Sequence, residues 1–414
     1  MQSGDSIIFT PAKIGPVTLR NRTIRSAAFE NMCTGHSPSK MLADYHLSVA
    51  RGGVGMTTIA YASVDRSGLS FDNQLWMRPE IVPQLRTLTD QIHATGAKVS
   101  IQLGHCGNMS HKSTAGRTPV SASSGFNMYS PTLVHGMSQS EIDQVARDFG
   151  DATRMAIDAG FDCVEIHAGH GYLISQFLSP YTNHRRDRYG GKLNDRMTFM
   201  RQCMEQVQKA ANGQIAVVAK TNMRDGFKGG NSIEEGIIIA QELEKLGCHA
   251  LVLSGGFVSR APMYVMRGAM PIQTLTGYMD CWWLKWSVRM FGKTLIKTEP
   301  YSDLYFLDDA KIIRQNVALP LIYVGGCVSK QGIEHVLNSG FLCVQMARAL
   351  IVMPDFVNQM RLGTQNCGCE HVNYCIGRMY SLEMACHKHR GDLTPRMTRE
   401  LEKFKRDNAK TSQT

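Results

Sequence analysis

The chain of 414 residues lacks two features that would place it in a membrane or outside the cell. It has no uninterrupted apolar run of membrane-spanning length, and residues 1–6 lack the basic and then apolar layout of a secretory signal. We therefore expect a cytoplasmic protein with no membrane partner. Extensive disorder is not expected either, because 43% of the residues are hydrophobic and 19% are charged, which is typical of a folded protein.

Charge of one sign is not gathered in a single segment. The formal net charge is +10, but the basic residues are spread along the chain, with only a moderate concentration after residue 388. This distribution predicts a solvated surface and no nucleic-acid partner. Disulfides are not expected, because most of the 12 cysteines lie in apolar segments typical of buried thiols in a reducing compartment, for example Cys163, Cys203, Cys248 and Cys343.

A glycine-rich dinucleotide loop is also missing, since no G-x-G-x-x-G opens a predicted helix. This argues against an open doubly wound sheet, the main alternative for a chain in which apolar strands alternate with helices. Eight apolar segments are predicted strands, at residues 22–26, 55–61, 98–103, 163–167, 215–222, 250–255, 319–325 and 342–347. Eight segments of helical length alternate with them, at about 38–51, 80–95, 140–159, 193–211, 232–247, 303–316, 330–338 and 354–361.

Eight strand–helix units predict a closed α/β barrel of the (β/α)8 (TIM) type over residues 1–365. About fifty residues separate the sixth and seventh strands, which predicts an aromatic insertion at about 257–302 with a helix around 279–292. It carries Trp282, Trp283 and Trp286, and three roles stay open: substrate access, a subunit contact, or a helix packed on its own barrel. Residues 366–414 are expected to form a C-terminal, cysteine-containing helical tail.

Two imidazoles and a phenol stand within six residues, directly after the fourth predicted strand, in His167-Ala168-Gly169-His170-Gly171-Tyr172. Active sites of such barrels lie at the carboxyl ends of the strands. Other motifs stand before and after this cluster: Ile14-Gly15 with Asn21-Arg22, Gln102-Leu103 with His105, and Asn183 with Arg185, Asp187, Tyr189 and Gly190-Gly191. Together, from about residue 7 to 361, they resemble the Old Yellow Enzyme family of FMN-dependent oxidoreductases, related to the barrel domain of 2,4-dienoyl-CoA reductase.

The resemblance implies an enzyme that binds FMN noncovalently, takes electrons from NADH or NADPH, and reduces an electron-poor alkene. In that family the two histidines polarise the oxygen of an α,β-unsaturated carbonyl or nitro group, which implies this role for His167 and His170. Tyr172 matches the family's proton donor to the α-carbon. Hydride reaches the β-carbon, so the implied activity is that of an ene-reductase on a small electrophilic substrate.

The same resemblance implies the flavin site. Gln102 matches the residue that binds the pyrimidine edge, and Lys220 matches the cation beside it. The implied cofactor-binding residues are Ser26, Ala27, Ala28, Phe29, Ala60, Gln102, His167, Lys220, Gly325, Gly326, Ala347 and Arg348. Two positions depart from the family: Phe29 stands where many relatives have Thr or Cys, and Ala347 stands where they have Gly.

The tail echoes the cysteine cluster of the longer relatives, in which four thiolates hold a [4Fe–4S] cluster. Val372 occupies the position of the second cysteine, so we expect no bound metal, although the roles of Cys367, Cys369, Cys375 and Cys386 stay open. Two alternatives remain for the function: a 2,4-dienoyl-CoA-reductase-like flavoenzyme with a metal or Fe–S tail, and an RNA-acting flavin barrel like the dihydrouridine synthases. The sequence leaves open the substrate, the choice between NADH and NADPH, and the oligomeric state, including a homo-oligomer.

Overall fold

The computed structural model describes residues 6–127 and 131–411, with side chains through residue 408. Eight parallel strands close into a barrel in chain order, because the last strand pairs with the first, Val344 facing Thr23. The eight are β3 (Thr23–Arg25), β4 (Met56–Ser63), β5 (Lys98–Gly104), β9 (Cys163–Ala168), β10 (Ala216–Asn222), β11 (Ala250–Ser254), β12 (Leu321–Val324) and β13 (Cys343–Met346). The predicted (β/α)8 barrel is therefore confirmed, with all eight strands at their predicted places.

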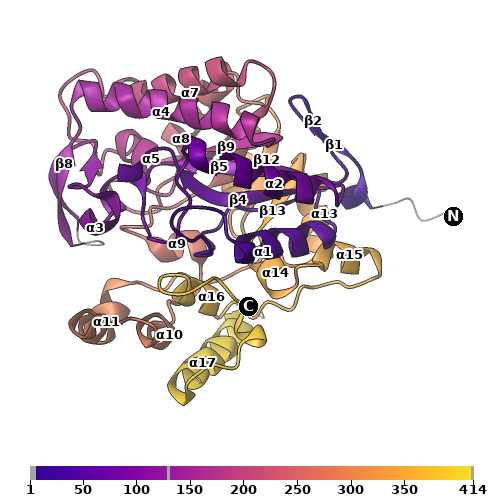
Figure 1. Cartoon of the computed structure of the whole chain (residues 1–414). Helices are drawn as coiled ribbons and strands as arrows, with labels where there is room; N and C mark the ends of the chain where they lie inside the picture. Colours follow the sequence, from indigo (N-terminus) through magenta and orange to yellow (C-terminus); the bar gives the residue numbers. More distant parts are fainter. Residues whose placement is uncertain (1–5, 128–130, 412–414) are drawn as a thin grey trace.

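Amphipathic helices surround the strands (Figure 1). The eight that follow the predicted order are α1 (Lys40–Arg51), α2 (Val82–His93), α4 (Gln139–Asp158), α7 (Thr198–Ala211), α8 (Ile233–Lys245), α12 (Leu307–Arg314), α13 (Lys330–Asn338) and α15 (Phe356–Arg361). Their apolar faces and the outward strand faces form one continuous core. Shorter helices lie in the connections: α3 (Lys112–Ala115), α5 (Leu173–Leu178), α6 (Leu193–Arg196) and α14 (Arg348–Val352).

The amino-terminal end of the barrel is closed by a hairpin of β1 (Ala12–Ile14) and β2 (Val17–Leu19). Gly15, at the turn, has a φ of +53°, a left-handed conformation that glycine adopts readily. The apolar side chains of the hairpin pack against the residues that start the barrel strands. Because the hairpin closes the amino-terminal end, a functional site is expected at the opposite end of the barrel, where the strands have their carboxyl ends.

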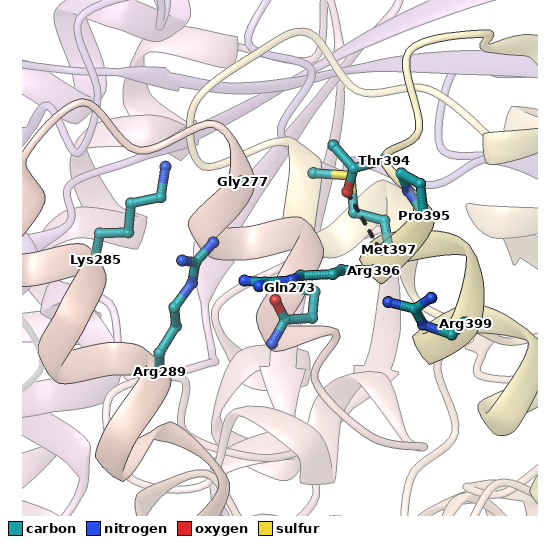
Figure 2. Close-up of a pocket in the computed structure, with 9 residues that line it drawn as sticks. All are labelled: Gln273, Gly277, Lys285, Arg289, Thr394, Pro395, Arg396, Met397 and Arg399. Carbon is teal, nitrogen blue, oxygen red and sulfur yellow. Dashed lines mark hydrogen bonds between the residues drawn. The ribbon is translucent and has the colours of Figure 1, made fainter.

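The predicted insertion and the tail pack together into one group of helices outside the barrel (Figure 1). The insertion forms α9 (Pro262–Met266), α10 (Ile272–Gly277) and α11 (Trp282–Leu295), and the tail forms α16 (Tyr374–Arg378) and α17 (Pro395–Thr411). A Cβ at Gly277 would lie 1.9 Å from Cε of Met397, so α10 and α17 touch closely. Figure 2 looks at the space between α11 and α17. The expected helix at 279–292 is displaced, since α11 begins at Trp282 and ends at Leu295.

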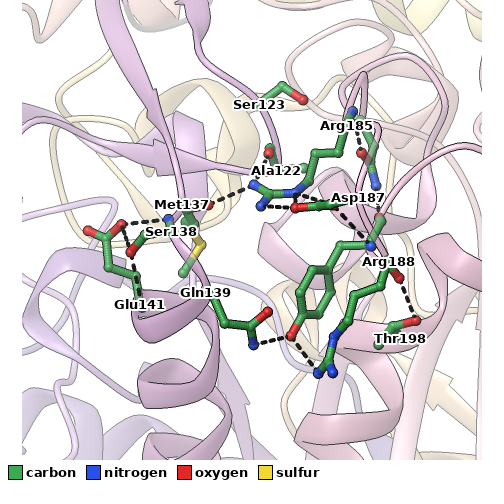
Figure 3. Close-up of polar contacts among 12 residues, drawn as sticks. Ala122, Ser123, Met137, Ser138, Gln139, Glu141, Arg185, Asp187, Arg188 and Thr198 are labelled. Atoms are coloured by element: carbon green, nitrogen blue, oxygen red, sulfur yellow. Dashed lines mark hydrogen bonds and ion pairs between the residues drawn. The ribbon is translucent and has the colours of Figure 1, made fainter.

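A three-stranded sheet that the sequence did not predict lies between β5 and α4. It consists of β6 (Val120–Ser121), β7 (Gly125–Asn127) and β8 (Thr132–Gly136). Arg185 holds this sheet in place, because its Nη1 donates to the carbonyls of Ala122 (2.9 Å) and Met137 (2.7 Å), as Figure 3 shows. Asp187 accepts from Nη2 of the same guanidinium at 2.6 Å. The motif from Asn183 to Tyr189 thus has a structural role, because Arg185 connects this sheet to the loop that follows β9 and α5.

Five short 3-10 helices complete the described chain, at Ile7–Phe9, Arg66–Gly68, Pro79–Ile81, Gly107–Met109 and His387–His389. Within the described ranges, no helix combines the length and apolar character needed to cross a membrane.

Candidate active site

The turn after β9 positions the histidine–tyrosine cluster. His167 is the penultimate residue of the strand, and His170 and Gly171 follow with φ values of +60° and +78°, which reverse the chain. A Cβ at Gly171 would lie 2.5 Å from the Phe257 ring, so only glycine fits there. The amide of Leu173 then donates to the carbonyl of His105 at 2.8 Å, fixing the start of α5.

The three predicted side chains converge. The ring centroids of His167 and His170 are 5.0 Å apart, and those of His167 and Tyr172 are 4.5 Å apart. Nε2 of His170 lies 2.7 Å from Oγ of Ser254 at the end of β11, and its backbone amide donates to Asn222 at 2.9 Å. The two imidazoles and the phenol therefore form one preorganised group at the carboxyl end of the barrel.

Burial sets the charge state of this group. It lowers the pKa of His170 to about 3, and the positive charge of Lys220 adds to the effect. Burial, followed by the charges of His170 and Lys220, lowers the pKa of His167 well below its ordinary value. Burial, with a smaller contribution from Cys106, raises the pKa of Tyr172 above its ordinary value. At neutral pH the site thus presents two neutral imidazoles and a protonated phenol.

A buried carboxylate that was not predicted from the sequence binds three side chains inside the barrel, and we call this group the floor of the site. Glu165 precedes His167 by two positions on β9, and its Oε1 lies 2.8 Å from Nζ of Lys220. The same oxygen accepts from Nε2 of Gln102 at 2.6 Å, while Oε2 accepts from Nε2 of Gln345 at 2.6 Å. Glu165 thus fixes Lys220 and Gln102, the two residues predicted to face a flavin. Its signal in the sequence was a charge inside an otherwise apolar strand.

A second buried ion pair holds the segment after β3. Nη1 of Arg25 lies 2.6 Å from Oε1 of Glu30, which accepts from the amide of Ala60 at 3.1 Å. Nη2 of Arg25 donates to the carbonyl of Ala28 at 3.0 Å. Ser26 points inward, where its Oγ donates to Gln345 at 3.0 Å and accepts from Lys220 at 3.3 Å. Ser26 therefore lies beside Lys220, while the Arg25–Glu30 ion pair holds the backbone of Ala28 and Ala60.

An aromatic contact joins the tail to the segment after β3. Phe29 stacks on Phe71 with centroids 4.4 Å apart, and Phe71 meets Tyr380 edge-on at 6.0 Å. Tyr380 follows α16, so a residue far along the chain lies close to the predicted flavin segment. Tyr380 was not among the predicted site residues, because nothing in the sequence around it indicates a barrel contact.

Cationic groups gather after β12 and β13, where the sequence predicted a phosphate site. Gly325 and Gly326 pack against Tyr305. Arg348 donates to Oδ1 of Asn373 at 3.0 Å and lies over the ring of Tyr301. Nearby, Nε of Arg267 and Nδ1 of His371 are buried, and neither has a hydrogen-bond partner among the residues that the structure describes. Arg267 and His371 were not predicted to belong to the site.

This donor set fits FMN. Buried polar atoms without partners and two guanidinium groups suit a phosphate, while an amide and a lysine beside Ser26 suit the pyrimidine edge of a flavin. Ala347 is the N-cap residue of α14, and half-buried Arg348 is the first residue of that helix. The residues predicted from β3, β4, β5, β9, β10, β12 and β13 thus lie around the carboxyl end of one barrel.

The tail cysteines are free thiols, like all the cysteines of the described chain. Burial raises the pKa of Cys367 and of Cys375 to about 12. Among the residues with described positions, no group of three or more His, Cys, Asp or Glu side chains is placed to hold a metal ion. Val372, at the position of the absent cysteine, is buried against Tyr374 and Leu401.

The barrel and its site define the class of flavin-dependent (β/α)8-barrel oxidoreductases. Within that class, the chain belongs to the NADH:flavin oxidoreductase / NADH oxidase family, whose model matches residues 7–275. The resemblance to the Old Yellow Enzyme family is confirmed, and the chain is an FMN-dependent NAD(P)H oxidoreductase.

Several proteins are similar to this chain. The 4,4'-dithiodibutanoate disulfide reductase of Rhodococcus erythropolis is 38% identical over 90% of this chain and 93% of its own length. An NADPH dehydrogenase of Listeria monocytogenes is 35% identical over 62% of this chain and 76% of its own. The Old Yellow Enzyme homologue of Zymomonas mobilis shares the fold, with a TM-score of 0.69 and 22% identity over 90% of this chain and 99% of its own. The chain spans about half the length of several longer relatives that it also matches.

Proposed function

We propose that this oxidoreductase is an ene-reductase that acts on α,β-unsaturated carbonyl compounds or similar electrophilic alkenes. The observation that carries the proposal is the convergence of two neutral imidazoles and one protonated phenol above a floor that contains Lys220. Bound FMN, reduced by NADH or NADPH, supplies the hydride for the β-carbon.

His167 and His170 bind the substrate oxygen. Neutral imidazole N–H groups donate to this oxygen, where negative charge grows as the β-carbon accepts hydride. Preorganised donors of this kind contribute about 3 kcal/mol each to transition-state stabilisation. The hydrogen bond between His170 and Ser254 and the contact of His167 with Tyr172 support fixed ring orientations.

Tyr172 supplies the proton. Its O–H bond breaks, the proton forms the new C–H bond at the α-carbon, and the phenolate is later reprotonated from solvent. Hydride and proton together saturate the alkene, so the electrons and atoms balance. The raised pKa keeps Tyr172 protonated throughout the neutral range. Tyr61 and Cys106 lie in one apolar cluster with Tyr172 and would form an apolar wall for the substrate.

The flavin contacts belong to the same proposal. Gln102 and Lys220 would hold the pyrimidine edge, and Arg348 with Gly325 and Gly326 would hold the phosphate. The strand-end residues from Ser26 to Phe29, with Ala60, His167 and Ala347, would complete the cradle. The ion pair between Glu165 and Lys220 supports this arrangement, because it fixes the cation at the floor of the site.

A second candidate activity is reduction of an organic disulfide. The relative that is 38% identical over most of this chain carries the name 4,4'-dithiodibutanoate disulfide reductase. A hydride delivered to one sulfur breaks the S–S bond and releases a thiolate, which a proton from Tyr172 converts to a second thiol. The same site could therefore serve both acceptors, and the two activities are distinguished by supplying each acceptor to the reduced enzyme.

The test uses the two half-reactions in stopped flow. With Tyr172→Phe we expect flavin reduction by NADPH to stay within twofold, while reoxidation by an enone slows by about 10²-fold or more because the proton donor is gone. Tyr181→Phe, at an exposed tyrosine, is the matched control and should leave both rates unchanged. Equal reoxidation rates for wild type and Tyr172→Phe would exclude the proposed role. Reoxidation by 4,4'-dithiodibutanoate but by no enone would favour the disulfide activity.

A further inference from the structure

Helix α11 presents an unpartnered aromatic surface. Trp282, Trp283 and Trp286 are 77%, 58% and 59% exposed, and Met290 is 59% exposed. We call these four residues the tryptophan face. The helix packs on α10 through Val288 and Gly292, where a Cβ on Gly292 would lie 2.9 Å from Ile272.

A basic groove adjoins this face. Lys285 and Arg289 of α11 and Arg396 and Arg399 of α17 line a cavity of about 420 Å³. Figure 2 shows Arg289 and Arg396 reaching toward each other from the two helices. Nε of Arg289 donates to Oγ1 of Thr276 at 3.0 Å, which holds the guanidinium in place.

The cations of the groove have no acidic partners. None of the four forms an ion pair within the described chain, and residues 281–298 contain no Asp or Glu. The carboxylate of Glu400, which follows Arg399 on α17, accepts from the amide of Gln273 on α10 at 2.8 Å. The groove therefore carries uncompensated positive charge.

The tryptophan face and the basic groove share one side of α11. Trp282, Trp286, Arg289 and Lys293 are spaced by four, three and four residues, the spacing that aligns side chains along one stripe of a helix. Lys285 lies beside them. Aromatic rings next to unpaired lysine and arginine side chains are the composition of helices that lie in the headgroup region of a bilayer.

We propose that α11 and the basic groove dock the protein reversibly on a bilayer that contains anionic phospholipid. The indole rings enter the headgroup region, while Lys285, Arg289, Arg396 and Arg399 contact lipid phosphates. This is contact with a membrane surface and not insertion across it, since α11 has 14 residues and four basic residues lie within 285–297. It therefore departs from the expectation of no membrane partner, which followed from the absence of a spanning segment.

Charge favours this partner over a second copy of the chain. In a two-fold dimer through this face, Lys285, Arg289 and Lys293 of one copy would meet the same cations of the other, and the chain carries a net charge of +10. An anionic lipid surface is complementary to both features of α11. It also accepts the indole rings, which a soluble phosphate would leave in water.

Sedimentation with vesicles tests the proposal, with tryptophan emission as a second readout. Three of the four tryptophans lie on α11, so insertion should shift the emission to shorter wavelength. We expect the wild-type holoenzyme to sediment with vesicles of phosphatidylcholine and phosphatidylserine, not with phosphatidylcholine alone, and less at higher salt. Arg289→Gln with Arg396→Gln should weaken binding about 25-fold, since each charge contributes about fivefold. Replacing the three tryptophans by serine should abolish it.

Matched controls separate this surface from general charge and from misfolding. Arg147→Gln with Lys209→Gln removes two cations from α4 and α7 and should change binding by less than twofold. Flavin content and NADPH oxidation in solution should be the same in every variant, which shows that each is folded. Wild-type protein that stays in the supernatant with both vesicles overturns the proposal. So does a dimer that becomes monomeric in the tryptophan variant, or tryptophan emission that responds to inorganic pyrophosphate but not to vesicles.

Discussion

Glu165 shows how a single buried charge organises the candidate site. Its side chain and that of Lys220 are each 2% exposed, and the carboxylate also accepts from Gln102 and Gln345. Two charges removed from water are costly, and they are tolerated only when they are paired and fully hydrogen-bonded. The structural role of Glu165 follows from this requirement, because Lys220 needs a carboxylate before any flavin is bound.

Replacing Glu165 should therefore be strongly destabilising. For Glu165→Leu we expect a loss of about 3–5 kcal/mol in the free energy of unfolding, since Lys220 would be left as a buried, unpaired cation. Urea unfolding at neutral pH measures it. Asp44→Asn, which breaks the exposed pair with Lys40, should cost less than about 1 kcal/mol. Equal losses for the two variants would contradict the proposed role of the buried pair.

At the residue scale, the sequence predicted those side chains that stand at strand ends within a motif. His167, His170, Tyr172, Lys220 and Gln102 were predicted in this way. Glu165 was missed because one charge inside an apolar run does not reveal what it faces. Arg267, His371 and Tyr380 were missed because the insertion and the tail bring them to the barrel by tertiary packing, which leaves no local pattern.

At the element scale, helix α4 illustrates why boundaries were predictable. Ser138 is its N-cap, and its side chain and that of Glu141 form a reciprocal capping box. Despite partial burial, the hydrogen bonds from Ser138 and Arg117 lower the pKa of Glu141 to about 2. The helix start is thus encoded locally.

Removing this cap should destabilise the protein modestly. Ser138→Ala should lower the free energy of unfolding by about 1 kcal/mol, because the amide of Glu141 loses its acceptor. Thermal or urea unfolding measures the loss. Ser140→Ala, two residues further on, is the control, because its hydroxyl lies 3.1 Å from that of Ser138 but is not the N-cap side chain, and it should change stability by less than half as much. A neutral Ser138→Ala would show that the cap does not limit stability.

The sheet of β6, β7 and β8 was not predictable from its own residues. Its strands are two, three and five residues long, too short for a clear alternation of apolar and polar side chains. Arg185 stabilises the sheet from a loop about fifty residues further on, through the carbonyls of Ala122 and Met137 (Figure 3). Short elements that depend on distant partners carry no periodic signal.

At the scale of the whole molecule, buried neutral histidines make the free energy of unfolding depend on pH. Burial lowers the pKa of His105 to about 4 and those of His170 and His371 to about 3, and His167 is lowered as well. The unfolded chain binds protons at these side chains near pH 6.5, whereas the folded chain does not. The free energy of unfolding therefore has its full value with respect to these histidines above about pH 6.5, and it decreases as the pH falls toward 4.

The acid sensitivity should be traceable to single residues. Between about pH 6 and 4, each such histidine should steepen the decline in unfolding free energy by up to about 1.4 kcal/mol per pH unit. His170→Asn should make the slope shallower by one such contribution, as measured by urea unfolding at several pH values. His184→Asn, at an exposed position, should leave the slope unchanged. A slope that His170→Asn does not alter would mean that His170 is protonated in the folded protein.

The carboxylate of Glu165 also constrains how such a barrel can diverge. One side chain joins β5, β9, β10 and β13, so its three partners cannot be exchanged independently. A substitution at Lys220, Gln102 or Gln345 is expected to be deleterious alone and tolerated only together with a change at Glu165, which double-mutant cycles would record as strong coupling. Laboratory evolution of a new acceptor specificity should therefore proceed through the apolar cluster of Tyr61 and Cys106 beside Tyr172, leaving the contacts of Glu165 with the other three strands intact.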